Sequence, residues 1–146
     1  MNGLLITNKY LASEKFVALK KGFLSAAFEL GTKLDYMDNF SAYNLIDGPI
    51  KYDYILYYDK DIKLASELER TGYKLYNNSR AIALCDDKYL TYSTLRQTIL
   101  QPKTLQSPAL YYGNLGDDIT FIEKCEIMFS YHMIIKECCG SFGFQV

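Results

Sequence analysis

Apolar and polar residues alternate with two different periods along residues 1–100. Short apolar runs at residues 3–8 and Tyr52–Tyr58 are typical of buried β-strands, and Leu34–Asn39 and Tyr73–Tyr76 predict two more strands. Between the predicted strands at residues 3–8 and Leu34–Asn39, apolar residues recur every three or four positions from Glu14 to Leu30. This period predicts an amphipathic helix. Strands that alternate with helices in this way predict an α/β fold with an open, mostly parallel sheet.

Polar residues at the expected helix ends support these boundaries. Ser13 is a plausible cap for the first helix, and Gly31 lies just beyond its end. The side of this helix expected to face inward carries Phe16, Leu19, Phe23, Ala27 and Leu30. The expected caps of the next three helices are Asp59 or Asp61, Asn78 or Ser79, and Asp86 or Asp87.

The pattern changes after residue 100. The stretch LQPKTLQSPALYYGNLGDD has no apolar period and holds two of the three prolines, so residues 101–116 are expected to form a crossing segment or linker. A short helix over about Asp117–Phe129 and a buried strand at Tyr131–Glu137 are predicted next. We therefore expect residues 1–100 to form one α/β domain and residues 117–146 to begin a second domain without completing it.

Composition and charge narrow the class of protein. The 146 residues are 49% hydrophobic, which excludes a disordered chain. Sixteen basic and seventeen acidic residues give a net charge of −1, which argues against a nucleic-acid binder. No stretch approaches the ~20 apolar residues of a membrane-spanning helix, and the N-terminus lacks a basic region before its short apolar run. The four cysteines include no CxxC pair, so we expect a cytoplasmic protein with reduced thiols.

The common nucleotide-binding and hydrolase motifs are missing. The turn after the first strand reads TNKYLASEK and contains no glycine, so the dinucleotide fingerprint is absent from its required place. There is no P-loop, H-E-x-x-H or G-x-S-x-G motif, and His132, beside a predicted buried strand, is expected to be a packed residue. Asp53, Asp59 and Asp61 could suggest a metal site, but helix caps and a solvated helix face explain them better.

The last segment, MIIKECCGSFGFQV, could bind an anion. Lys136 ends the predicted strand, and the following loop contains Gly140, Ser141 and Gly143. Glycines let backbone N–H groups approach an anion closely, and a lysine at the strand end adds a compact positive charge. A surface hairpin whose glycines serve only the turn is the alternative interpretation.

Three segments together resemble the ATP-grasp superfamily, most closely its RimK-like carboxylate–amine ligases of the glutamate-ligase type. They are LYNNSRAIALCDDKYLTYSTL, then QPKT, then IIKECCGSFGFQV. The block YDYILYYDKDIKLASELERTGYKLYN also looks like the N-terminal domain of these enzymes. The resemblance covers nearly the whole chain and implies a Rossmann-like pre-ATP-grasp domain followed by the start of an ATP-grasp domain.

The resemblance also implies cofactors and site residues. Family members use ATP and Mg²⁺ to convert a small carboxylate into an acyl phosphate, which an amine substrate attacks to give an amide. Lys88 and Lys136 would contact the nucleotide, and a mobile loop would close over its phosphates. The residues of that loop would be Gly140, Ser141, Phe142 and Gly143. Asn8 and Lys9, at the end of the first strand, are weaker candidates for substrate contacts.

The chain departs from the family pattern in one respect. In the family, the adenine pocket and the Mg²⁺ ligands lie downstream of the glycine-rich loop, where this sequence stops at Val146. We therefore expect the chain as given to be catalytically inactive, because phosphoryl transfer depends on its metal ions. The alternative is a non-catalytic Rossmann-like module that binds a ligand or serves as a partner subunit.

Overall fold

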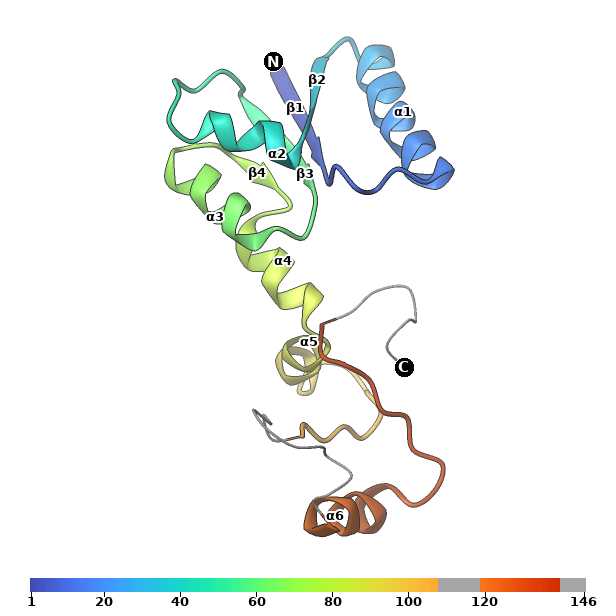
Figure 1. Ribbon diagram of the computed structural model, residues 1–146. Helices are drawn as coiled ribbons and strands as arrows, with labels where there is room; N and C mark the ends of the chain where they lie inside the picture. Colours follow the sequence, from blue (N-terminus) through green and yellow to red (C-terminus); the bar gives the residue numbers. More distant parts are fainter. Residues whose placement is uncertain (108–118, 140–146) are drawn as a thin grey trace. The chain divides into compact units, whose positions relative to one another are not determined.

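A computed structural model describes residues 1–107 and 119–139 (Figure 1). Contacts within the chain divide it into two compact units, Met1–Ala83 and Leu84–Val146. We call them the first and second units, and each is described by itself. No helix in the described part of the chain is both long and apolar enough to span a membrane.

The first unit is built on a parallel sheet of four strands. They are β1 (Asn2–Thr7), β2 (Lys33–Asp38), β3 (Tyr54–Tyr58) and β4 (Leu75–Tyr76), in the spatial order β2-β1-β3-β4. All three neighbouring pairs run parallel. The predicted α/β fold with an open parallel sheet is confirmed. The chain leaves β1 toward β2 on one side and returns to β3 on the other, so the direction of winding reverses at β1.

Helices connect the strands, and polar caps fix several of their ends. In chain order they are α1 (Glu14–Glu29), α2 (Asn39–Ala42), the 3₁₀ turn η1 (Tyr43–Leu45) and α3 (Ile62–Arg70). A further helix, α4 (Ser79–Asp86), follows β4, and its last residues belong to the second unit. Ser13 precedes α1 in an extended conformation, but its side chain makes no capping hydrogen bond. Asp61 caps α3 by accepting a hydrogen bond from the backbone N–H of Leu64. Gly31, with φ of +66°, follows α1 in the left-handed region that glycine tolerates.

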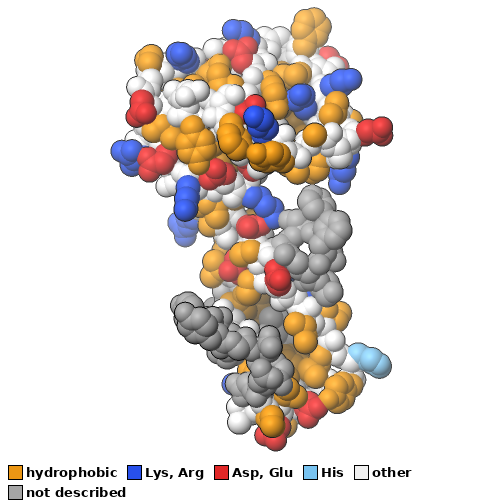
Figure 2. Space-filling model, viewed as in Figure 1, with side chains coloured by type: hydrophobic (Ala, Val, Ile, Leu, Met, Phe, Trp, Pro, Cys, Tyr) orange, Lys and Arg blue, Asp and Glu red, His pale blue; other side chains and the backbone are white. Residues whose placement is uncertain are grey.

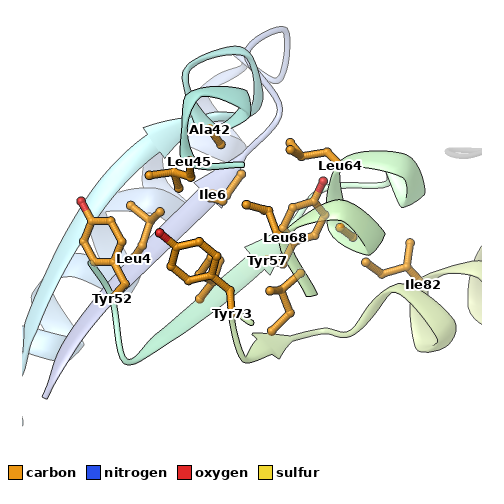
Figure 3. Close-up of a cluster of buried hydrophobic side chains, with 13 residues drawn as sticks. Leu4, Ile6, Ala42, Leu45, Tyr52, Tyr57, Leu64, Leu68, Tyr73 and Ile82 are labelled. Atoms are coloured by element: carbon orange, nitrogen blue, oxygen red, sulfur yellow. The ribbon is translucent and has the colours of Figure 1, made fainter. Parts of the chain in front are cut away.

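The core lies on one face of the sheet, under α2, η1 and α3 (Figure 3). Leu4 and Ile6 of β1 point into it because side chains on a strand alternate between its two faces. They join a cluster of buried residues that also includes Ala42, Leu45, Tyr52, Ile55, Tyr57, Leu64, Leu68 and Tyr73. The intervening Leu5 is fully buried on the opposite face of the sheet, where α1 packs.

The structure corrects two details of the expected first unit. No helix was predicted between Leu34–Asn39 and Tyr52–Tyr58, but α2 and η1 lie there, and their Ala42 and Leu45 are buried. Asp38 caps α2 by accepting a hydrogen bond from the N–H of Ser41 at 2.8 Å, and this signal was missed because the expected strand continued through Asn39. Leu30 was expected to face inward but is 81% exposed, because α1 ends one residue before it.

The second unit contains α5 (Lys88–Leu95) and α6 (Ile119–Phe129). Both helices were predicted, and Asp87 caps α5 as one of the two expected candidates. The buried strand predicted at Tyr131–Glu137 is wrong, since this segment forms no strand and its Ile134 and Ile135 are 75% and 77% exposed. An apolar run becomes a strand only where a neighbouring strand takes its hydrogen bonds, and the described residues supply none there.

Candidate functional site

Lys88 of the second unit binds the backbone of a distant segment. Its ammonium Nζ donates hydrogen bonds to the carbonyl oxygens of Glu137 at 3.0 Å and Cys138 at 3.4 Å. Its backbone N–H donates to the same Cys138 carbonyl at 2.9 Å. Asp87 and Cys139 form an isolated antiparallel bridge beside these contacts. Residues 137–139 therefore cross the first turn of α5.

Lys136 directly precedes this crossing segment and is exposed. The two lysines singled out from the sequence are thus carried by backbone segments that touch each other, although Lys88 and Glu137 are 49 positions apart. Asp87 fixes the start of α5 at this crossing, because its Oδ1 accepts hydrogen bonds from the N–H groups of Tyr89 and Leu90 at 2.8 and 2.9 Å. The predicted loop residues Gly140, Ser141, Phe142 and Gly143 lie outside the described residues.

Two cysteines and the histidine lie on the exposed segment near the α5 crossing. Cys138 and Cys139 are free, exposed thiols. Desolvation and the neighbouring carboxylate of Asp87 raise the pKa of the Cys139 thiol, which disfavours the nucleophilic thiolate. His132 is exposed, not packed against a buried strand as expected. Among the residues described, no group of three His, Cys, Asp or Glu is placed to hold a metal ion.

The carboxyl ends of β1 and β3 form the position at which open α/β sheets usually bind ligands, because the winding reverses there. Asn8 follows β1, and its side-chain amide donates hydrogen bonds to the Asp59 carboxylate after β3 at 3.1 and 3.4 Å. The Asn8 side-chain oxygen accepts from the backbone N–H of Tyr10 at 2.9 Å. Asn8, a weaker candidate for a substrate contact, is therefore engaged in tying the two loops together.

The backbone N–H groups of residues 9–12, in the loop after β1, all donate hydrogen bonds. The N–H of Lys9 donates to the side-chain oxygen of the buried Asn39 at 2.9 Å. The N–H of Leu11 donates to the Asn8 carbonyl at 3.2 Å, and that of Ala12 donates to the Tyr10 carbonyl at 3.0 Å. A dinucleotide-binding turn instead leaves successive N–H groups pointing at a phosphate. The loop after β1 therefore lacks both the glycines of a dinucleotide-binding turn and, at residues 9–12, its unpaired N–H groups.

Asp61, at the start of α3, serves the fold. One of its carboxylate oxygens accepts from the N–H of Leu64 at 3.0 Å, and the other accepts from the hydroxyl of Tyr43 at 2.9 Å. Its backbone carbonyl accepts from the hydroxyl of the buried Tyr57 at 2.8 Å. The hydrogen bond to Asp61 raises the pKa of Tyr43, and burial raises that of Tyr57 far more. The cap interpretation of Asp61 is confirmed.

A hollow of about 140 Å³ opens on the other face of the same sheet end, between α1 and the ends of β1 and β2. Its polar lining includes Thr7, Lys9, Lys20 and Tyr36. Lys20 and Tyr36 were missed from the sequence because each follows the pattern of its element. Lys20 reads as a solvated helix residue, and Tyr36 reads as a strand residue. Only the parallel pairing of β1 with β2 brings Thr7 and Tyr36 together.

Comparison with known proteins gives two similar sequences and no matching family model. The chain is 37% identical over 128 residues to the "Uncharacterized protein MG012 homolog" of Mycoplasma pneumoniae, a match that covers 81% of this chain and 43% of that protein. It is 34% identical over 94 residues to the "Uncharacterized protein MG012" of Mycoplasma genitalium, over 61% of this chain and 32% of that protein. The chain thus spans less than half the length of both relatives.

Proposed function

We propose that this chain is the N-terminal part of an ATP-dependent carboxylate–amine ligase of the ATP-grasp type. Such an enzyme activates a carboxylate as an acyl phosphate and transfers the acyl group to an amine. The contact between Lys88 and the carbonyls of Glu137 and Cys138 carries the proposal. It draws together two segments that the resemblance assigns to one nucleotide, even though their residues lie far apart in the sequence.

The chemistry of the two lysines supports this assignment. Bound ATP would supply the phosphoryl group, whose charge must be offset during transfer. The ammonium groups of Lys88 and Lys136 would approach the phosphate oxygens from the first turn of α5 and from the segment before Glu137. A lysine is a compact donor that follows a phosphate without a fixed geometry. The proposal assigns the Mg²⁺ ligands to parts of the longer protein outside this chain.

The loop after β1 also supports the assignment of the nucleotide to Lys88 and Lys136. Its N–H groups at residues 9–12 are all engaged, so they offer a phosphate no unpaired donor at the usual nucleotide position of an α/β sheet. A nucleotide would then depend on side chains elsewhere, and Lys88 and Lys136 are the residues that the resemblance assigns to it.

Calorimetric titration of the 146-residue chain with ATP and Mg²⁺ tests the proposal. We expect saturable binding that weakens about tenfold in Lys88→Met and in Lys136→Met, which corresponds to about 1.4 kcal/mol for each lost phosphate contact. Lys124→Met is the matched control, because Lys124 is an exposed lysine of α6 in the same unit and should leave the affinity unchanged.

Two results would contradict the proposal. One is the absence of nucleotide binding, which would favour a non-catalytic α/β binding module. The other is an equal loss in all three variants, which would indicate a general charge effect. A separate assay addresses the reaction itself: the longer Mycoplasma pneumoniae relative should release ADP only when given ATP, a carboxylate and an amine. The present chain should release none under the same conditions.

A further inference from the structure

We propose that the hollow between α1 and the ends of β1 and β2 binds the carboxylate of a small organic acid. All of its lining residues belong to the first unit, and neither Lys88 nor Lys136 is among them. Binding at the hollow therefore does not depend on the proposed nucleotide site. Only the idea that this acid is a substrate would rest on the proposed ligase function.

The charge of the lining favours an anion. Acidic and basic side chains are mixed over the visible face of the first unit in Figure 2, without a patch of one sign. The hollow differs, because Lys9 and Lys20 are its charged residues and no Asp or Glu lines it. Lys20 is the principal cation, since its ammonium lies 4.3 Å from the ring centre of Tyr36, itself part of the lining. The Lys9 ammonium lies 5.0 Å from the ring centre of Phe40, outside the lining.

A pair of hydroxyl groups supplies a hydrogen-bond donor. Thr7 is only 8% exposed, and its hydroxyl lies 3.2 Å from the hydroxyl of Tyr36. Two hydroxyl groups carry two hydrogens between them, and the hydrogen bond that joins them uses one. The other hydrogen is left to donate to a further acceptor. A carboxylate placed beside Lys20 would receive both this hydrogen bond and the charge of the ammonium.

The surrounding backbone favours a carboxylate over a phosphate. Phosphate sites usually gather several backbone N–H groups, but those of residues 9–12 already donate within the loop or to Asn39. Leu11, Phe16 and Leu19 add apolar surface to the lining. The space of about 140 Å³ admits several non-hydrogen atoms. A carboxylate with a short aliphatic chain satisfies both the polar and the apolar parts of the lining.

Backbone NMR titration of the ¹⁵N-labelled chain tests this site with butyrate, with the neutral isostere butyramide, and with inorganic phosphate. Butyrate should cause saturable shifts at the amides of Thr7, Lys20 and Tyr36. Butyramide should bind at least tenfold more weakly, because it lacks the charge that Lys20 recognises. Phosphate should produce no saturable shift at these amides.

Three variants distinguish specific binding at the hollow from a general effect of the protein's charge. Lys20→Met should weaken butyrate binding about tenfold, and Tyr36→Phe should weaken it severalfold while it keeps the ring in place. Lys21→Met removes an exposed lysine from the next position of α1 and should change nothing. Each variant is used only if its amide spectrum retains the dispersion of the parent.

Four outcomes would overturn the assignment. The first two are failure of butyrate to shift any of the three amides and equal binding of butyramide. The others are saturable phosphate binding that Lys20→Met abolishes, and equal losses from Lys20→Met and Lys21→Met. None of these outcomes bears on nucleotide binding at Lys88, which is measured with ATP on different residues. Failure here and failure of the proposed function are thus distinguishable.

Discussion

Replacement of Asp61 by alanine should destabilise the first unit by about 1.5–2 kcal/mol, because two hydrogen bonds to one carboxylate are lost. The first bond caps α3 through the N–H of Leu64 at 3.0 Å, and loss of such a cap costs about 1 kcal/mol. The second comes from the hydroxyl of Tyr43 at 2.9 Å, and a partly exposed bond of this kind contributes about 0.5–1 kcal/mol. The carbonyl of residue 61, which holds Tyr57, is retained.

Two milder variants divide this loss. Asp61→Asn keeps one oxygen for the cap but replaces the oxygen that accepts from Tyr43, and Tyr43→Phe removes the same bond from the other side. Each should cost about 0.5–1 kcal/mol, less than Asp61→Ala. The double variant Asp61→Asn/Tyr43→Phe should cost little more than either single change, because both remove one shared interaction.

Native-state hydrogen exchange at Leu5 and Leu56 measures these losses, because both residues lie on internal strands of the sheet, whose amides exchange when the first unit opens. Equal losses in Asp61→Ala and Asp61→Asn would show that the cap contributes nothing. No loss of stability in any variant would show that neither hydrogen bond of the Asp61 carboxylate stabilises the first unit, which would refute the reasoning.

Three further predictions concern other parts of the chain. Burial raises the pKa of Tyr57 far above its ordinary value of 10.0, so the free energy of unfolding should be constant below pH 10 and fall as the pH rises beyond it. Urea unfolding at alkaline pH measures this fall, which should be smaller in Tyr57→Phe. A side chain at Gly3 would place its Cβ 2.4 Å from the ring of Tyr54, so Gly3→Ala should cost about 1–3 kcal/mol in urea unfolding, and much less in a Tyr54→Val background. The amides of residues 131–139 should exchange hydrogen faster than those of β1, because they lack a strand ladder, and similar protection would contradict the absence of a strand there.

The strands and long helices of the first unit could be predicted because their local pattern and their burial agree. Residues 3–8 read as a buried strand, and β1 indeed has a neighbouring strand on each side. The same reasoning failed at Ile134 and Ile135, where an apolar run has no strand beside it. Apolar character reports a tendency toward burial, whereas a strand also needs a partner for its backbone.

The candidate sites show a similar limit. Asp61 could be recognised as a cap from its position before an apolar helical pattern, because a cap is a local property. The pairing of Thr7 with Tyr36 depends on the register of β1 against β2, which no local pattern specifies. The contact of Lys88 with Glu137 depends in the same way on the path of the chain through the second unit.

The loop after β1 links the two proposals through its hydrogen bonds. Sheets that bind nucleotides at this position leave N–H groups unpaired for phosphates, whereas here Asn8 and Asn39 take up those of Tyr10 and Lys9. A phosphate could gain these donors only by breaking the bonds that hold the loop, including the tie from Asn8 to Asp59. A carboxylate suits this sheet end better than a phosphate, because a carboxylate needs only one cation and one or two hydrogen-bond donors. The engaged amides therefore favour an acid at the end of β1 and leave a nucleotide to the lysines of the second unit.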